Sequence, residues 1–313
     1  MMDLRQKIID ASKLLNVDYV GFGSVKRFRN EPVLQIFDRT KTVICLGFRV
    51  LRGSFRGIEE GITYHHYCTT GIETIEETVM PMALLKLSGI IEDAGFLAVP
   101  QKNNQLITAD PEDTNPEITY EDIYRGVARE VQMNYAASAV LCGIGEIGLS
   151  GKVLTDENGP FQRFCFILTD AELEETPLAQ PHICDGCREC IRSCPGHAIS
   201  EEGKLDNWQC AAYYNGASMK NNPFMPPDAF PGLEDRLEII AGEAQVTPET
   251  ARKILDKIYF YPPAHHSYPC SICGRACDVA CYVHLEEKGV LTKKYKTPFR
   301  KRAPWAFSVE DFK

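Results

Sequence analysis

The thirteen cysteines of this 313-residue chain are its most informative residues, and nine of them lie between Cys184 and Cys281. Four of the nine, followed by a proline, have the spacing C-x2-C-x2-C-x3-C-P: Cys184, Cys187, Cys190 and Cys194. Three thiolates spaced in this way each reach one iron of a cubane, whereas the fourth points away and ligates a second cluster. The spacing therefore predicts two [4Fe–4S] clusters.

A second, irregular cysteine group supplies the remaining ligands: Cys210, Cys270, Cys273 and Cys277. In ferredoxins with two clusters, the fourth cysteine of the first run ligates the other cluster, so the groups exchange their last ligands. We therefore expect one cluster on Cys184, Cys187, Cys190 and Cys277, and the other on Cys194, Cys210, Cys270 and Cys273. Cys281 follows Cys277 at x3 spacing and is the alternative eighth ligand.

Two other uses of the cysteines fit less well. Two CxxC pairs could bind zinc, but the x2, x2, x3 spacing before a proline fits a cubane better. Disulfide frameworks belong to short secreted chains. The cysteines outside the two groups lie in apolar or helical contexts and are expected to be small buried residues: Cys45, Cys68, Cys142 and Cys165.

Composition and charge restrict the class of protein. The net charge is −9, from 34 basic and 43 acidic residues, which argues against a binder of DNA. No apolar run reaches the length of a membrane span. Asp3, Arg5 and Lys7 lie where a signal peptide needs an apolar stretch, and no twin-arginine pair precedes them. We therefore expect a cytoplasmic protein with no membrane partner.

The first part of the chain alternates between helical and extended patterns. Helices are expected over 4–15, 71–93 and 120–142, strands over 19–25, 42–50, 97–100 and 164–170, a strand and turn over 153–159, and a loop over 102–116. An acidic, proline-containing linker over 171–182 predicts the domain boundary. The expected domains are 1–175, then 176–285 with an insertion over 211–269, then a tail over 286–313. Helices are expected in the insertion at 231–243 and at 247–259, the second with Thr247 as its N-cap.

Gly143, Gly145 and Gly148 form a G-x-G-x-x-G pattern, and Asp170 lies about where a ribose-binding acid would follow. A dinucleotide-binding loop follows a strand and opens a helix. This loop follows a helical pattern and precedes a strand-like run. A tight loop that lets backbone segments approach closely is therefore favoured over a nucleotide site.

The order of the motifs resembles that in the superfamily of epoxyqueuosine reductases and reductive dehalogenases. The resemblance rests on CGIGEIGLSGKVLTDENGPFQRFCFILTD (142–170), ICDGCRECIRSCPGHAI (183–199), Cys210 and CSICGRAC (270–277). It covers 130–281 well. It implies an α+β protein in which a nitroreductase-like α/β domain precedes a two-cluster domain like bacterial ferredoxin, with a helical insertion. It also implies cobalamin in the N-terminal domain, with a flavin as the less favoured cofactor.

The resemblance also suggests roles for individual residues. Gly143, Gly145 and Gly148 would lie against the cofactor, Arg163 would bind an anionic group near the cobalt, and Tyr135 is a candidate proton donor. Further weak candidates are Tyr64, Tyr120, Tyr124, His65 and His66.

Some features depart from the best-known members. The position of the proton-donating aspartate of epoxyqueuosine reductase falls at Arg129, and neither Asn134 nor Tyr135 replaces that acid. The helical-repeat extension of that enzyme has no counterpart here. We therefore expect a relative of epoxyqueuosine reductase and not that enzyme itself.

The expected function is that of an iron–sulfur oxidoreductase which reduces an unknown small-molecule or protein substrate with electrons from a low-potential donor, such as ferredoxin or flavodoxin. As a corrinoid- and iron–sulfur-dependent reductase it would be an enzyme. The alternative is an electron-transfer or reactivation protein that reduces a partner's cofactor without a corrinoid of its own. Six basic residues between Lys293 and Arg302 indicate a solvated strap or a contact for an acidic electron donor.

Overall fold

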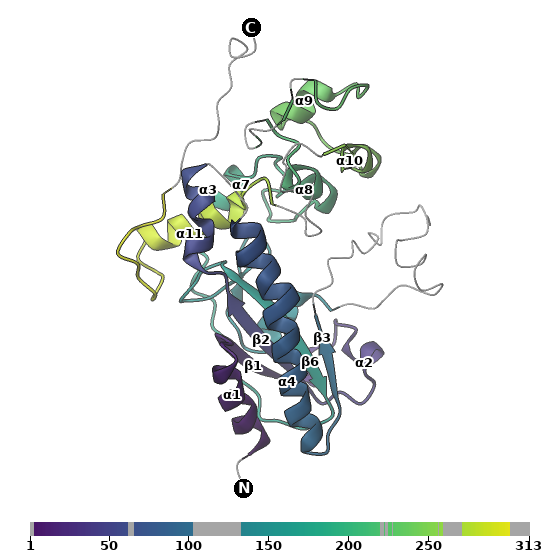
Figure 1. Cartoon of the computed structure of the whole chain (residues 1–313), viewed down its shortest axis with the longest axis vertical. Helices are drawn as coiled ribbons and strands as arrows, with labels where there is room; N and C mark the ends of the chain where they lie inside the picture. The colour runs from purple at the N-terminus through teal and green to yellow at the C-terminus, as the bar shows by residue number, and fades with distance from the viewer. Residues whose placement is uncertain are drawn as a thin grey trace. The chain divides into compact units, whose positions relative to one another are not determined.

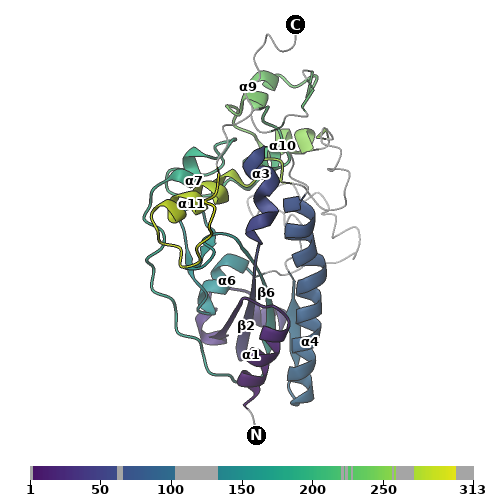
Figure 2. The ribbon, with the colours of Figure 1, turned by 60° about the vertical axis from the view of Figure 1, so that its left-hand side comes forward.

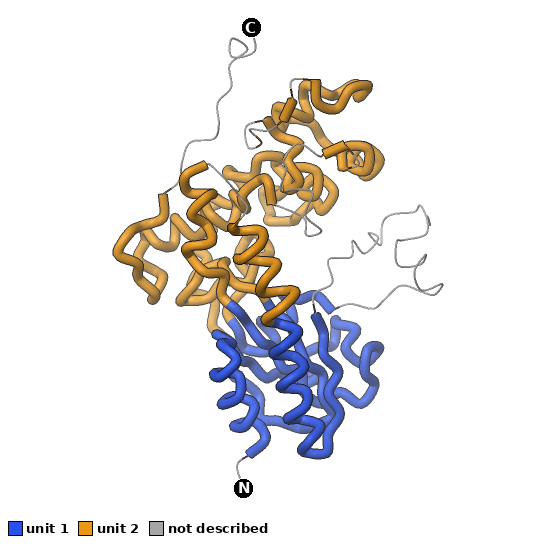
Figure 3. Tube along the Cα trace, in the orientation of Figure 1, with its two compact units in different colours: residues 1–48, 80–144, 164–178 blue, residues 49–79, 145–163, 179–313 orange. Residues whose placement is uncertain are grey.

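A computed structural model describes residues 3–61, 66–102, 133–219, 222, 225–226, 228–255, 257–258 and 271–300. The chain divides into two compact units (Figure 3). Unit 1 comprises 1–48, 80–144 and 164–178, and unit 2 comprises 49–79, 145–163 and 179–313. The two units alternate along the chain, whereas the sequence patterns suggest contiguous domains.

A four-stranded sheet forms the centre of unit 1. Its strand order is β1-β2-β6-β3, with β1 at Tyr19–Ser24, β2 at Thr42–Arg49, β3 at Ala98–Gln101 and β6 at Gln162–Thr169. β1 pairs with β2 and β3 pairs with β6, both antiparallel. Seven of the eight residues of β2 are buried, as expected for a central strand covered on both faces.

Helices cover both faces of this sheet (Figures 1 and 2). On one face, the Arg5 guanidinium of α1 (Leu4–Leu14) lies 4.7 Å from the centre of the Phe22 ring. On the other face, the end of α6 (Tyr135–Leu141) approaches β1 so closely that a Cβ at Gly21 would lie 2.3 Å from the Cys142 carbonyl oxygen. α4 (Met80–Asp93) packs against α1 and β3. Unit 1 is therefore a layered α/β unit with its own core.

Unit 1 also contains two short helices, η1 (Val25–Arg27) and α2 (Val33–Ile36). The elements of unit 2 are mostly short helices. They are η2 (Arg52–Phe55), α3 (Arg56–Glu60), the π-helix η3 (Tyr67–Val79), the hairpin strands β4 (Glu146–Ile147) and β5 (Val153–Leu154), α7 (Glu189–Arg192), α8 (Asn207–Tyr214), α9 (Arg236–Ala241), α10 (Pro248–Leu255) and α11 (Ala276–Glu287).

Packing in unit 2 brings the cysteine-bearing segments together. α7 packs against α11, and α8 packs against α10. Phe161 stacks on Phe55 at 4.0 Å and on Tyr282 of α11 at 4.4 Å between ring centres. Stacked aromatic rings of this kind add specific geometry to the apolar area that they bury.

Most expected elements are confirmed within the described residues, including the helix at 4–15 and the strands at 19–25, 42–50, 97–100 and 164–170. The long helical pattern at 71–93 is one continuous helical run whose first part, η3, is π-helical. The Thr250 backbone N–H donates to the Thr247 hydroxyl at 3.2 Å, which confirms the expected N-cap. The expected loop at 102–116 and most of the expected helix at 120–142 lie outside the described residues.

The four cysteines expected to be structural are buried and unbridged. Burial raises the pKa of Cys45, Cys142 and Cys165, so these thiols stay protonated. Among the described helices, none combines the length and the apolar character needed to cross a membrane. The mixture of helices and sheet confirms the α+β class.

Candidate iron–sulfur centre

Glu146 holds the loop that carries the first cysteine group. It lies on β4 with 5% of its surface exposed. One carboxylate oxygen accepts hydrogen bonds from the backbone N–H groups of His182 and Ile183, and the other accepts one from Cys184 at 2.8 Å. Burial alone would raise the pKa of Glu146, but these three donors together hold it below its usual range. The carboxylate therefore anchors the start of the cysteine loop.

The backbone of the same loop is shaped for a turn around the thiols. Gly186 and Arg188 have φ of 70° and 63°, and the Cys187 N–H donates to Asp185 Oδ1 at 3.1 Å. The Leu149 N–H, from the segment after β4, donates to Cys184 Sγ at 3.4 Å. Hydrogen bonds to cysteine sulfur are one of the means by which proteins set cluster potentials.

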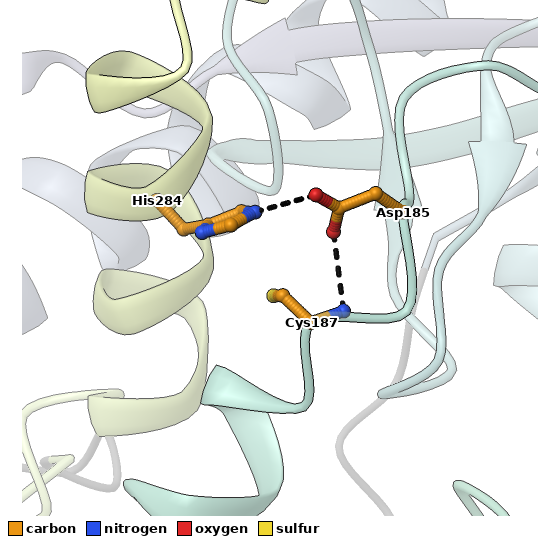
Figure 4. A group of neighbouring side chains, drawn as sticks. All are labelled: Asp185, Cys187 and His284. Atoms are coloured by element: carbon orange, nitrogen blue, oxygen red, sulfur yellow. Dashed lines mark hydrogen bonds and ion pairs between the residues drawn. The ribbon is translucent and has the colours of Figure 1, made fainter.

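His284 of α11 faces this loop (Figure 4). Its Nε2 lies 2.8 Å from Asp185 Oδ2, and the possible ligand atoms of Asp185, Cys187 and His284 all lie within 4.8 Å of one another. Cys187 is the middle member of the C-x2-C-x2-C run, so this trio lies at the edge of the first cysteine group. Asp185 and His284 fix the position of the loop relative to α11.

Cys281 lies near the first group. Burial raises its pKa, and the neighbouring charges that raise it further are those of Asp278, Cys190, Cys184 and Cys187. α11 packs against α7, which begins at Glu189 and therefore carries Cys190. Four thiols thus gather at this place in unit 2.

Cys277 lies elsewhere on α11. Together with three other cysteines it lines one cavity: Cys194, Cys210, Cys273 and Cys277. The Ala198 N–H donates to Cys194 Sγ at 3.3 Å, and the Ser271 hydroxyl lies 3.6 Å from Cys273 Sγ. Cys277 also packs against Cys190 and Ile191, so it lies between the two groups of thiols.

Gln209 holds the α8 segment that carries Cys210. Its buried amide donates to the carbonyl oxygens of Gly196 at 2.7 Å and Ala244 at 2.8 Å, and it accepts from the Val246 N–H at 2.6 Å. One side chain therefore connects α8, the turn that follows Cys194, and the insertion.

Burial favours the protonated form of three thiols of the cavity, those of Cys210, Cys273 and Cys277. Burial raises the pKa of Cys210 to about 11 and also raises those of Cys273 and Cys277. Binding of iron would displace these protons, because a coordinating thiol is deprotonated by the metal. Four sulfur donors around one cavity are the ligand set of a cubane.

Two cations line the same cavity. Arg275 donates to Asp278 from Nε at 2.8 Å and from Nη2 at 2.5 Å. The charge of Arg275 and burial both lower the pKa of Lys152. An anionic cluster in the cavity would oppose both effects, so the charges as well as the sulfur atoms fit a thiolate-bound cluster.

Cys277 lines the cavity and also packs against the cluster of Cys190, Ile191 and Ile199, whereas the charges of Cys184, Cys187 and Cys190 act on Cys281. The expected partition, with Cys277 on the first cluster, stays a prediction. Since Cys277 and Cys281 are four residues apart on one helix, they are successive members of one face and differ by one turn. Cys270 lies outside the described residues.

Close packing within the chain explains the three glycines of the G-x-G-x-x-G pattern. Gly143 has φ of 84°, and a Cβ there would lie 2.5 Å from the Pro177 carbonyl oxygen. Gly145 has φ of 59°, and its Cβ would lie 2.1 Å from the Leu154 carbonyl oxygen. A Cβ at Gly148 would lie 2.8 Å from a Leu154 methyl group. These glycines allow backbone segments to approach each other closely. Their presence therefore does not by itself indicate a bound corrinoid.

The other candidates have structural partners. Arg163 pairs with buried Glu76 at 3.3 Å, and the Tyr135 ring packs edge-on against Phe166 at 5.1 Å. Asp170 accepts the Leu97 N–H at 2.8 Å, and Asn134 caps α6 by accepting the Ala137 N–H.

Of the remaining candidates, the structure describes only His66. His66 is exposed, and Tyr64, His65, Tyr120, Tyr124 and Arg129 lie outside the described residues.

Glu146 and Lys152 are residues of this centre that no sequence motif identifies. The only sequence signal for them is their position, in and directly after the glycine pattern. Their roles depend on side-chain contacts with cysteine segments at least 35 residues further along the chain.

Comparisons with known proteins give local sequence matches and a similar fold. No family model matches the chain. An epoxyqueuosine reductase of Atelocyanobacterium thalassa is 35% identical over 83 residues, 26% of each chain. A tetrachloroethene reductive dehalogenase of Desulfitobacterium hafniense is 36% identical over 67 residues, 20% of this chain and 12% of that protein. These matches therefore span about a quarter or less of the curated relatives.

A solved catabolic reductive dehalogenase in complex with 3-bromo-4-hydroxybenzoic acid covers 97% of this chain, with a TM-score of 0.50 and 15% identity. The chain covers 42% of that protein, and at this identity the likeness concerns the fold alone. The local sequence matches and this shared fold support the superfamily of epoxyqueuosine reductases and reductive dehalogenases for the chain.

Proposed function

We propose that this protein is an iron–sulfur oxidoreductase of the reductase superfamily, with two [4Fe–4S] clusters in unit 2. The observation that carries the proposal is the gathering of eight described thiols into two sets of four. One set lines a single cavity. The other consists of Cys184, Cys187 and Cys190 together with Cys281, on which the charges of these three thiols act.

When bound, the clusters supply one-electron transfer, and the side chains of the protein hold the cysteine segments in position. Glu146 holds the start of the first cysteine loop. Gln209 holds the α8 segment that carries Cys210. Both side chains are buried, so they keep the cysteine segments in place before a cluster binds, and this preorganisation lowers the cost of ordering the ligands.

The superfamily resemblance adds the finer part of the proposal. A corrinoid in the N-terminal part of the chain would be the electron acceptor, a low-potential ferredoxin or flavodoxin the donor, and a small molecule or a protein the substrate. The three glycines of the G-x-G-x-x-G pattern have a full explanation in chain packing. The second candidate, an electron-transfer protein without its own corrinoid, therefore has an observation in its favour.

Metal analysis and cobalamin binding separate the two candidates. The protein is purified without oxygen, reconstituted, and mixed with cobalamin. About eight irons per chain with a stoichiometric corrinoid would support the reductase. About eight irons without corrinoid would support the electron-transfer protein, and about four or fewer would contradict the two-cluster proposal.

Serine variants of the two α11 cysteines test the proposed ligand sets. In Cys281→Ser we expect loss of the first cluster, and in Cys277→Ser loss of the cluster in the cavity, because each thiol lies with a different set. Electron paramagnetic resonance of the reduced proteins identifies which cluster signal disappears. Retention of both clusters in Cys281→Ser would instead support the exchange expected from the sequence, with Cys277 on the first cluster.

A further inference from the structure

Lys152 is a cation that lines a cysteine cavity of unit 2. It follows the turn after β4, and its carbonyl oxygen accepts the Gly148 N–H at 2.8 Å, so its backbone position is fixed by the β4–β5 hairpin. Its side chain lines the cavity of Cys194, Cys210, Cys273 and Cys277. Among residues 3–61, 66–102, 133–219 and the later described segments, none forms a hydrogen bond or an ion pair with its ammonium group.

The other cation of the cavity is neutralised. Arg275 is bound by Asp278 through two nitrogen atoms of its guanidinium group. The charge of Asp278 also acts on Lys152, so one carboxylate faces two cations and one positive charge remains in excess beside the cavity. An excess charge in a partly buried place is unfavourable, and a cubane held by thiolates is an anion that supplies the missing negative charge.

The cations near the first cysteine group are paired differently. Arg188 lies 2.7 Å from Glu201 and Arg192 lies 2.5 Å from Glu189. His284 Nε2 lies 2.8 Å from Asp185 Oδ2. Each of the two arginines there has a carboxylate of its own, whereas Arg275 and Lys152 share the charge of Asp278. The two cysteine groups therefore differ in how the cations around them are paired.

We propose that Lys152 raises the reduction potential of the cluster held in the cavity and so favours electron transfer toward it from the first cluster. This inference rests on the proposed two-cluster function. Reduction adds one negative charge, and a fixed cation at short range stabilises the reduced form more than the oxidised form. The electron comes from a low-potential donor of the ferredoxin or flavodoxin class. No covalent bond forms or breaks, and Lys152 keeps its proton.

The test is a redox titration of the reconstituted, full-length protein, followed by electron paramagnetic resonance. The variants are K152M, which removes the charge, K152Q, which keeps a neutral donor, and K152R, which keeps the charge. K204M is the matched control, because Lys204 is an exposed lysine of the same unit. Iron content is measured first, since a wild-type protein without about eight irons would contradict the proposed function and not this inference.

In K152M and K152Q we expect at least a tenfold lower ratio of reduced to oxidised protein for one cluster at a fixed applied potential, a shift of about 59 mV for a one-electron couple. The other cluster should be unchanged, and K152R and K204M should resemble the wild type. Unchanged potentials in K152M and K152Q with both clusters bound would overturn the inference. Loss of the cluster from both neutral variants, with retention in K152R, would also overturn it, because the charge would then serve binding and not potential.

Discussion

At the scale of single residues, Glu146 is the clearest example of a side chain that positions the metal ligands without being one. Its carboxylate accepts three backbone N–H groups at the start of the first cysteine loop. Hydrogen bonds to a charged acceptor contribute about 1.5–3 kcal/mol each, and a buried N–H group left unpaired is costly. The first cluster should therefore depend on Glu146 more than the second.

Replacing Glu146 by alanine tests this dependence. We expect iron to fall from about eight to about four per chain, with the signal of the cavity cluster retained, because the three N–H donors lose their acceptor. Iron analysis and electron paramagnetic resonance provide the measurement. Glu157→Ala, at an exposed position of the same segment, is the control. A full complement of iron in Glu146→Ala would show that the loop is held by other contacts.

The candidate residues show how far residue types and spacing can predict a site. The C-x2-C-x2-C run predicts thiols that gather, and the structure has them on one loop and α7. Arg163 and Tyr135 are chemically suitable side chains, but their contacts with Glu76 and Phe166 are packing and pairing contacts. A residue type alone cannot distinguish these uses, because the partner comes from a distant part of the chain.

At the scale of elements, the β4–β5 hairpin connects the two cysteine groups. Glu146 of the hairpin contacts the first cysteine loop, and Lys152, at its other end, lines the cavity. Gly145 makes the hairpin possible, since its φ is 59° and a Cβ would lie 2.1 Å from the Leu154 carbonyl oxygen. Distortion of this hairpin should therefore lower both the stability and the iron content of unit 2.

Gly145→Ala is expected to destabilise the protein and to lower its iron content. The left-handed backbone conformation costs an alanine about 1–2 kcal/mol, and the contact with the carbonyl oxygen adds to this cost. Thermal unfolding of the reconstituted protein measures the effect. Gly151→Ala is the matched control, because Gly151 has φ of 72° but no atom within 4 Å of its Cβ position. Equal losses in the two variants would mean that the close approach contributes nothing.

At the scale of the whole molecule, the two units depend on metal to different degrees. Unit 1 has a sheet whose central strand β2 is buried at seven of its eight residues, with helices on both faces. The cysteine segments of unit 2 are short helices and loops that meet around thiols. Because metal binding to such segments contributes directly to the free energy of folding, removal of iron should loosen unit 2 and leave unit 1 folded.

Hydrogen exchange with and without an iron chelator tests this expectation. We expect faster exchange in the loop 184–194, in α8 and in α11 after iron removal, and unchanged exchange in β1, β2 and β6. Local opening of this kind is read directly from amide protection. An equal loss of protection in the sheet would show that the two units unfold together and that the metal stabilises both.

The sequence by itself predicted the metal chemistry that we propose for this protein. Cysteine spacing is a local property of the chain. The spacing within a loop of a few residues is therefore sufficient to predict the ligands of a cubane without knowledge of the rest of the fold. The same holds for α1, β1, β2 and the Thr247 cap, whose patterns depend on neighbouring residues.

Only the tertiary structure decided which side chains surround the thiols and which charges face them. Cys277 and Cys281 are one helical turn apart; Cys277 lines the cavity and packs against the Cys190 cluster, whereas the charges of Cys184, Cys187 and Cys190 act on Cys281. The position of Lys152, beside the cavity and near Asp278, likewise depends on segments that are distant in the sequence. Long-range packing produces these neighbours, and local patterns contain no information about them.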